Sequence, residues 1–200
     1  MILGSYHIGA MPGWQVVVAG QAQRLKASGL LAATGKILVG ISCLKPEERD
    51  VSVQFVDRLL DGKATFATDK SVCVYEFLTL KALQDYVGQN GDGAKVWYIH
   101  TKGIMSGNHG HRLAMEKATI DRHEFCQAVL DEMDTCGVFW RDAKTHGSDY
   151  GHYSGNFWWA NSAYLKTLPK IADLDLKNRY LAEFWIGMGK EHKHFDMGAG

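Results

Sequence analysis

Cysteine is scarce in this chain, and no two cysteines form a C-x-x-C pair. The four of them, Cys43, Cys73, Cys126 and Cys136, are scattered and show no zinc-ribbon spacing. Isolated cysteines of this kind are typical of buried thiols in a reducing compartment. The sequence therefore argues against a disulfide scaffold and against a structural zinc module.

Long apolar runs and an excess of one charge are also lacking. No stretch approaches eighteen consecutive apolar residues, and the first residues have no basic segment followed by a long apolar one, so we expect neither a membrane span nor a signal peptide. The 22 basic and 22 acidic residues cancel, which argues against bulk nucleic-acid binding. The sequence predicts a cytoplasmic protein and leaves its oligomeric state open.

The composition is that of one folded domain. The chain has 200 residues, of which 46% are hydrophobic and 22% are charged. A chain of this size can bury a core without disulfides or metal ions. Since we find neither an internal repeat nor a linker, we expect a single domain over residues 1–200.

The order of expected elements predicts an α/β fold. Apolar runs at 2–8 and 36–43 predict buried strands, and helical spacing over 14–25 places a helix between them, which makes a parallel βαβ unit. Further strands are expected at 64–67, 71–75, 95–99, 138–140 and 156–160, and further helices at 79–87, 112–135, 162–168 and 178–188. Residues 51–60 fit either type, and 190–200 read as a polar tail. This alternation favours a mostly parallel central sheet.

The motif His100-Thr101-Lys102-Gly103 directly follows an expected buried strand. A lysine, a hydroxyl and free backbone amides at such a strand end can surround a diphosphate. The alternative is a solvated lysine beside a strand-end histidine with ordinary partners. The motif is not a P-loop, because no G-x-x-x-x-G-K-[ST] precedes it.

A second motif, Ser154-Gly155-Asn156-Phe157-Trp158-Trp159, combines small polar groups with aromatic rings. Such a mixture suits a sugar, which offers C–H patches together with hydroxyls. The alternative is a core strand whose tryptophans only pack, and at least one of them should do so because neighbours on a strand face opposite sides.

Two glutamates stand in apolar surroundings. Glu183 could serve as a general base, since burial raises the pKa of a carboxyl group, although an i,i+4 pair with Arg179 is a serious alternative. Glu76, expected at the end of a strand, could accept hydrogen bonds from a ribose, a base or a sugar. In the tail, His192 and His194 near acidic residues could hold a divalent metal, or could simply be exposed.

Taken in order, several stretches resemble a family of small glycosyltransferases with the GT-A nucleotide-sugar fold, found in bacterial polysaccharide loci and among large-virus proteins that glycosylate capsids. The stretches that carry the resemblance are Tyr6-His7-Ile8, Ser28-Gly29-Leu30, Tyr75-Glu76-Phe77-x-Thr79-Leu80, Tyr98-x-His100-Thr101-Lys102-Gly103, Ser154 to Ala160, and Ala182-Glu183-Phe184-Trp185. They extend across nearly the whole chain.

The resemblance implies a three-layer α/β/α GT-A-like domain that transfers a hexose or deoxyhexose from a nucleoside diphosphate sugar, such as a UDP-sugar, to an acceptor hydroxyl on a glycan or glycoprotein. It implies Glu183 as catalytic base. The implied donor site comprises Tyr6, His7, Glu76, Thr79, His100, Thr101 and Lys102; the sugar and acceptor side comprises Ser154, Gly155, Asn156 and Trp158.

Metal dependence is where the sequence departs from this family. His100-Thr101-Lys102 stands where relatives keep an Asp-x-Asp metal site, so Mn²⁺ or Mg²⁺ is an open question and Lys102 could neutralise the diphosphate instead. His192 or His194 would be the implied metal ligand, by analogy of fold alone. Two other functions stay open: a noncatalytic nucleotide- or carbohydrate-binding domain, and a metal-dependent phosphoryl hydrolase.

Overall fold

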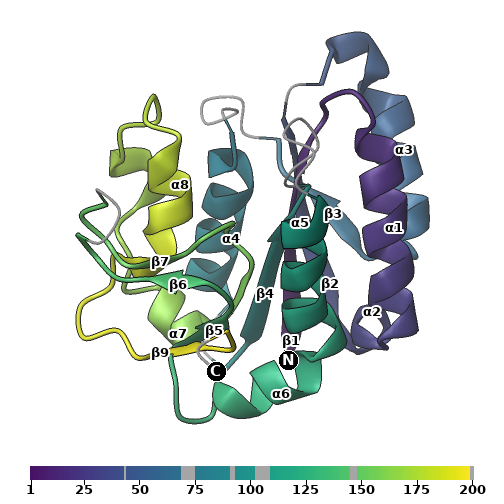
Figure 1. Ribbon diagram of the computed structural model, residues 1–200. Coiled ribbons are helices and arrows are strands. Elements are labelled where there is room, and N and C mark those ends of the chain that lie inside the picture. Colours follow the sequence, from purple (N-terminus) through teal and green to yellow (C-terminus); the bar gives the residue numbers. More distant parts are fainter. Residues whose placement is uncertain (43, 69–74, 91–92, 102–108, 145–147, 199–200) are drawn as a thin grey trace.

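A seven-stranded sheet of order β3-β2-β1-β4-β8-β5-β9 forms the centre of the molecule (Figure 1). The computed structural model describes all residues except 43, 69–74, 91–92, 102–108, 145–147 and 199–200, and omits the side chain of Pro46. The strands are β1 (Ile2–Gly9), β2 (Lys36–Ser42), β3 (Ala64–Phe66), β4 (Lys95–His100), β5 (Thr135–Gly137), β8 (Trp158–Asn161) and β9 (His194–Asp196), with β6 (Trp140–Arg141) and β7 (His152–Tyr153) forming a separate antiparallel pair.

The central sheet is mostly parallel, as the sequence predicted. β1 pairs in parallel with both β2 and β4, β2 pairs in parallel with β3, and β5 pairs in parallel with β9. β8 is antiparallel to both of its neighbours, β4 and β5. An antiparallel strand begins where its neighbours end, so the residues that precede β8 lie at the carboxyl edge of the parallel strands.

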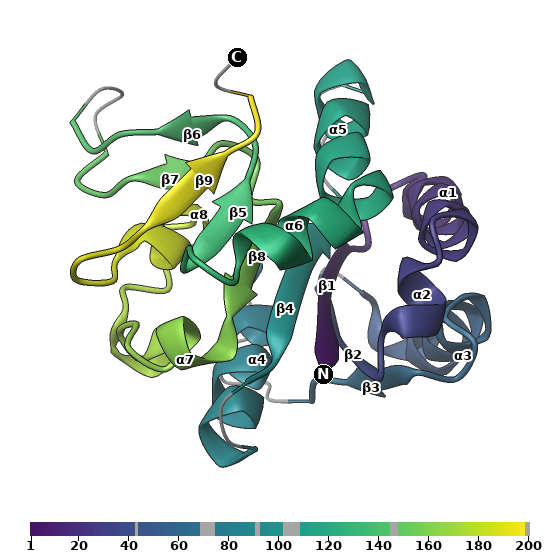
Figure 2. The ribbon, with the colours of Figure 1, turned by 90° about the horizontal axis from the view of Figure 1, so that it is seen from below.

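Helices cover both faces of the sheet, which gives three layers (Figure 2). The helices are α1 (Trp14–Ala27), α2 (Leu30–Ala33), α3 (Arg49–Leu59), α4 (Phe77–Gln89), α5 (His109–Glu116), α6 (His123–Val129), α7 (Ser162–Leu165) and α8 (Tyr180–Phe184). Side chains of α1, α2, α3, α5 and α6 share one apolar core with one face of the sheet, and those of α4, α7 and α8 share a second core with the other face. We call these the α1 face and the α4 face.

The period of two along the strands distributes residues between the two cores. On β1, Tyr6 and Ile8 pack on the α1 face and Leu3 on the α4 face. Trp158 and Trp159 are both fully buried, but in different cores, so the expectation that at least one packs in the core is confirmed for both.

Most expected elements of the first hundred residues are confirmed. α1 buries Trp14, Val17, Val18, Gln21, Ala22 and Leu25, the helical spacing read from the sequence. The ambiguous segment 51–60 belongs to α3, whereas the strand expected at 71–75 lies mostly outside the described residues, and Tyr75 stands in a turn.

The prediction of one long helix over 112–135 was wrong. Its residues form α5, a π-helical turn η3 (Lys117–Asp121) and α6, and β5 begins at Thr135. Arg122, with φ −101° and ψ 28°, leaves the helical region between η3 and α6, and the two helices run in different directions (Figure 2). The apolar residues of α5, η3 and α6 all pack in the same core, so in the sequence they resemble the apolar stripe of a single helix.

The end of the chain also differs from expectation. The strand expected at 138–140 is replaced by β5 and β6 on either side of Val138 and Phe139, and the helix expected at 178–188 shortens to α8 followed by the 3-10 turn η5 (Trp185–Gly187). The tail, expected to be polar loop, contributes β9 to the sheet. Two other 3-10 turns, η1 (Pro46–Glu48) and η4 (Ile171–Asp173), complete the described elements. No helix among the described residues is long and apolar enough to cross a bilayer.

Candidate functional site

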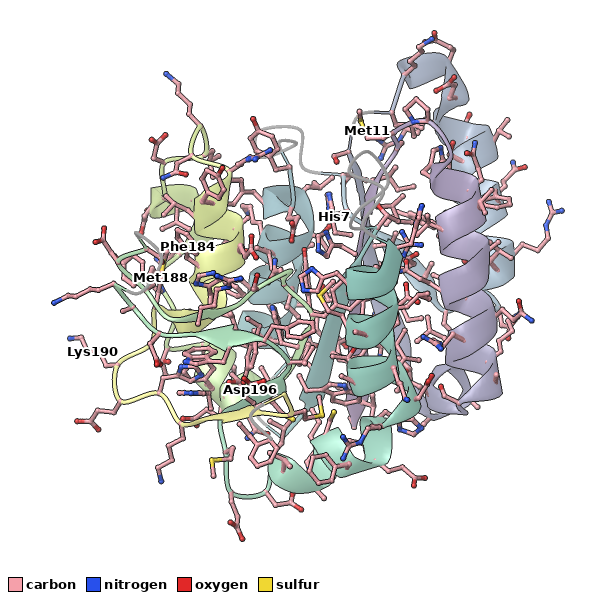
Figure 3. The ribbon with its side chains drawn as sticks, viewed as in Figure 1. His7, Met11, Phe184, Met188, Lys190 and Asp196 are labelled. Carbon is pink, nitrogen blue, oxygen red and sulfur yellow. The ribbon has the colours of Figure 1, made fainter. Side chains whose placement is uncertain are left out.

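A polar cluster lies on the α4 face where β1 and β4 end (Figure 3 labels His7 at this edge). The strand order of the sheet reverses at this place, because β2 and β3 lie on one side of β1 and β4 lies on the other. Open α/β sheets bind ligands at the carboxyl ends of the strands where the order reverses.

The turn Gly155–Asn156, just before β8, is the centre of the cluster. Both residues have left-handed backbones, with φ 100° for Gly155 and φ 56° for Asn156. Glycine adopts this conformation at no steric cost, and asparagine tolerates it better than most residues. The turn holds three ionisable groups of the cluster, Glu76, His100 and Glu183.

Glu76 is held by the side chain of Asn156. The Nδ2–H of Asn156 donates to Oε2 of Glu76 at 2.5 Å, and the hydroxyl of Tyr98 donates to the same oxygen at 2.8 Å. Asn156 is fully used, because its Oδ1 accepts from Nε1 of Trp158 at 2.7 Å. Burial, reinforced by the Glu76 carboxylate, raises the pKa of Tyr98, so its hydroxyl remains a donor.

Glu76 does not end a strand, as the sequence suggested, but immediately precedes α4. A carboxylate at a helix N-terminus is stabilised by the helix dipole. α4 can approach the sheet closely there because β2 carries Gly40, where any Cβ would overlap Oγ1 of Thr79.

Glu183 and His100 are bound to the backbone of the same turn. The N–H of Gly155 donates to Oε1 of Glu183 at 2.5 Å, which ties half-buried Glu183 on α8 to the cluster. The Nε2–H of His100 donates to the carbonyl oxygen of Gly155 at 2.7 Å, and Nδ1 lies 3.4 Å from Oε1 of Glu76. Two carboxylates and an imidazole thus surround one two-residue turn.

His7 joins three elements beneath the cluster. Its Nδ1 is hydrogen-bonded to Oγ1 of Thr79 at 2.8 Å and its Nε2 to Oγ of Ser42 at 3.1 Å, which links β1 to α4 and to the end of β2. Burial lowers the pKa of His7 to about 4, so the ring is neutral at pH 7. His7 therefore braces the site.

Thr101 ties the ends of β1 and β4 together. The N–H of Gly9 donates to its Oγ1 at 2.9 Å, and its own N–H donates to the carbonyl of His7 at 3.1 Å. The next residue, Lys102, is a predicted diphosphate ligand that lies outside the described residues.

Nine of the residues singled out from the sequence lie in or directly beside this cluster: His7, Glu76, Thr79, His100, Thr101, Gly155, Asn156, Trp158 and Glu183. Ser154 precedes the turn and donates its N–H to the carbonyl of Phe139. Sequence reasoning missed Ser42, although a hydroxyl at the end of an expected buried strand was a usable signal.

Three of the residues singled out lie elsewhere. Tyr6 points to the α1 face, where its hydroxyl donates to Oε1 of Gln21 at 2.5 Å. His192 is hydrogen-bonded to Oγ1 of Thr135 at 2.7 Å and stacks on Tyr164, and His194 stacks on Trp140 with ring centroids 3.9 Å apart. Thr135 begins β5, level with the amino-terminal half of β4, so these histidines are remote from His100.

His192 and His194 are the metal ligands that the analogy of fold implies. Within the described part of the chain, no group of three or more His, Cys, Asp or Glu side chains is placed to hold a metal ion. Of the carboxylates near them, Asp134 accepts a hydrogen bond from the backbone N–H of Lys193, and Asp196 accepts one from the backbone N–H of Trp140.

One comparison places the chain among known families. Residues 63–193 match the family model described as a domain of unknown function, DUF8361. The chain belongs to this family. No curated protein matches the chain. The DUF8361 segment contains every residue around the Gly155–Asn156 turn, including Glu76, His100 and Glu183, whereas His7 and His194 lie outside it.

Proposed function

We propose that this DUF8361 protein is a glycosyltransferase of GT-A-like fold that moves a sugar from a nucleoside diphosphate sugar to an acceptor hydroxyl. The observation that carries the proposal is the Gly155–Asn156 turn, which orients Glu76, Glu183 and His100 together at the ends of β1 and β4, where the strand order reverses. Ligands of open α/β sheets bind at such positions, and transfer reactions need catalytic groups held in fixed geometry.

Glu183 is the proposed general base. In an inverting reaction its carboxylate takes the proton of the acceptor hydroxyl while that oxygen bonds to the anomeric carbon of the donor. The bond from this carbon to the diphosphate oxygen breaks, and its electron pair leaves with the nucleoside diphosphate. An ionised carboxylate has about four lone-pair positions, so the hydrogen bond from Gly155 leaves acceptor capacity for the incoming proton.

The other cluster residues would bind the donor. Glu76 would accept hydrogen bonds from ribose, base or sugar hydroxyls, and His100 and Thr101 would border the diphosphate, with Lys102 supplying a cation next to them. The acceptor would be a glycan or glycoprotein hydroxyl on the side of Ser154 and Trp158. The resemblance noted from the sequence supports the same assignment of roles.

A thermal-shift panel tests the donor proposal. Nucleoside diphosphates and nucleotide sugars are added one at a time, each with and without Mn²⁺ or Mg²⁺. A ligand at a hundred times its Kd stabilises the folded state by about 2.7 kcal/mol, which raises the Tm of a domain of this size by about 5 °C or more. No shift with any nucleotide, with or without metal, would overturn the proposal.

A turnover assay separates the proposal from its rivals. Purified protein is given each stabilising nucleotide sugar, and release of the nucleoside diphosphate is followed with and without acceptor glycans. Turnover supports a transferase. Binding without turnover indicates a noncatalytic domain, and release of inorganic phosphate that EDTA stops indicates a metal-dependent hydrolase.

A further inference from the structure

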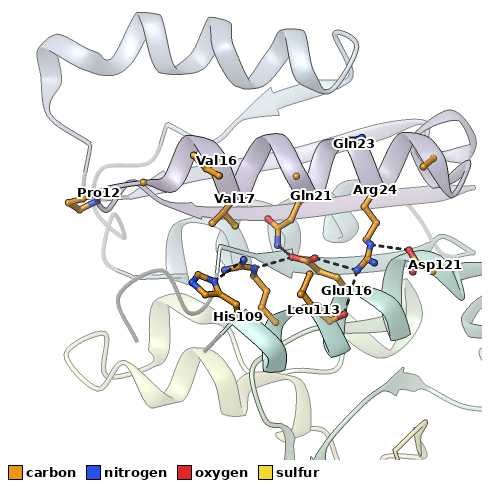
Figure 4. Close-up of a pocket in the computed structure, with 14 residues that line it drawn as sticks. Pro12, Val16, Val17, Gln21, Gln23, Arg24, His109, Leu113, Glu116 and Asp121 are labelled. Carbon is orange, nitrogen blue, oxygen red and sulfur yellow. Dashed lines mark hydrogen bonds and ion pairs between the residues drawn. The ribbon is translucent and has the colours of Figure 1, made fainter. Parts of the chain in front are cut away.

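A pocket of about 910 Å³ lies between α1 and α5, on the α1 face (Figure 4). Its lining includes Val16, Val17, Gln21 and Arg24 of α1 and Leu113 and Glu116 of α5. This volume is within the range of small-molecule sites. The cluster around the Gly155–Asn156 turn lies on the opposite face of the sheet, so the pocket is a different site.

The walls of the pocket are aliphatic. Val16 is 78% exposed and Leu113 is 50% exposed, although both are large apolar side chains, and they come from the two helices that form the opposing walls. Gly13 and Gly20 on the α1 side have no atoms near the position of a Cβ, which leaves room beside Val16 and Val17. A ligand with an apolar body would cover these surfaces and gain from their removal from water.

The floor of the pocket is the buried carboxylate of Glu116. Oε1 of Glu116 accepts from Nε2 of Gln21 at 2.8 Å and lies 3.3 Å from Nε of Arg112, while Oε2 lies 3.5 Å from Nη1 of Arg24. Burial raises the pKa of Glu116. The floor of the pocket therefore presents two guanidinium groups, those of Arg24 and Arg112, around one carboxylate.

Arg24 reaches across the pocket, and its contacts with the described residues are long (Figure 4). Its guanidinium lies 3.5 Å from Glu116, 3.3 Å from Asp121 and 3.5 Å from the carbonyl of Leu113, and its side chain is 30% exposed. Charge-assisted hydrogen bonds are strongest at about 2.7–2.9 Å, and guanidinium groups bind carboxylates in a bidentate fashion. A carboxylate that approaches Arg24 can therefore form shorter bonds than those it replaces.

We propose that this pocket binds a small amphipathic carboxylate, with its apolar body between Val16 and Leu113 and its carboxylate on Arg24. The site does not depend on the proposed transfer reaction. It does touch the cluster through one residue, because Gln21 donates both to Glu116 and to the backbone carbonyl of His100.

Octanoate and octanol test the proposal as probes that share an apolar chain and differ in charge. Methyl resonances of the folded protein are followed by NMR during titration with each probe. We expect octanoate to shift the methyl signals of Val16, Val17 and Leu113 and to bind about tenfold more tightly than octanol, the size of effect expected of a charged hydrogen bond. Arg24→Gln should remove this preference.

Val16→Asp and Val51→Asp form a matched pair of variants. Both valines are highly exposed on helices, at 78% on α1 and 71% on α3, so neither change should affect folding, which urea denaturation checks. Val16→Asp should abolish octanoate binding, and Val51→Asp should leave it intact. Equal affinity for octanoate and octanol, shifts at other methyl groups, no binding at all, or loss of binding in Val51→Asp alone would each overturn the proposal.

Discussion

The two faces of the sheet hold their charged groups in different ways. Around the Gly155–Asn156 turn, carboxylates and imidazole are held by bonds of 2.5–2.8 Å, two of them to the backbone. Around Glu116 on the other face, Gln21 donates at 2.8 Å, but the arginine contacts are longer, at 3.3–3.5 Å. Fixed donors and acceptors suit catalysis, because they need no reorganisation during reaction, whereas loosely held charges can exchange partners for a ligand.

Replacing Glu183 has the largest expected effect, and it tests whether the polar cluster around the Gly155–Asn156 turn is catalytic. Glu183→Gln keeps an acceptor oxygen for the N–H of Gly155 but removes the base, so transfer should fall by about 10²–10⁴-fold while nucleotide binding survives. Initial rates and a thermal shift with the same donor measure the two effects. The control is Glu124→Gln, an exposed position on α6. Near-native turnover in Glu183→Gln would rule out the base assignment.

A pH series tests whether His7 braces the cluster as a neutral ring. Its folded-state pKa of about 4 is below the ordinary value of 6.5, so the unfolded chain binds more protons in this range. The free energy of unfolding should therefore be highest above about pH 6.5 and should fall by roughly 3 kcal/mol as the pH drops toward 4. This figure follows from about 1.4 kcal/mol for each unit by which the pKa of His7 is lowered on folding.

Urea denaturation at pH 7.5, 6.5, 5.5 and 4.5 measures this loss, and His7→Gln should flatten the dependence. His192, whose pKa burial also lowers to about 4, should leave a residual slope in that variant. His109→Gln, exposed on α5, is the matched control. A slope unchanged by His7→Gln would show that this ring is not the group responsible.

A smaller effect tests how the turn is maintained. Asn156→Ala leaves the buried Nε1 of Trp158 without its acceptor and places alanine at φ 56°, so we expect a loss of about 2 kcal/mol in unfolding free energy. Asn156→Gly removes the same side chain but accepts the backbone conformation, so it should be less destabilised than the alanine variant. Equal stabilities of the two variants in urea would show that backbone conformation contributes nothing.

The sequence was most informative where local spacing decides structure. The apolar runs at 2–8 and 36–43 and the helical spacing between them predicted β1, α1 and β2, because a buried strand or helix face requires its own period. The residues around Gly155 were also singled out, since small polar residues beside aromatics at a strand are conspicuous.

Sequence reasoning missed the pocket for a physical reason. Gln21, Arg24 and Glu116 are ordinary residues on helices, and only Arg112 and Glu116, spaced i,i+4, gave a local signal. Their convergence depends on the packing of α1 beside α5, which lies about ninety residues later in the chain. No local period records a contact between segments so far apart.

Sequence by itself determined the types of most elements in the first hundred residues, the two-sided burial of the strands and most members of the polar cluster. Only the tertiary structure decided which of them meet. The antiparallel β8 brings Gly155 and Asn156 to the ends of β1 and β4, strand alternation sends Tyr6 to the opposite face, and β9 holds His192 and His194 at a distance. Contacts between distant segments depend on strand order and register, which follow from packing the whole chain.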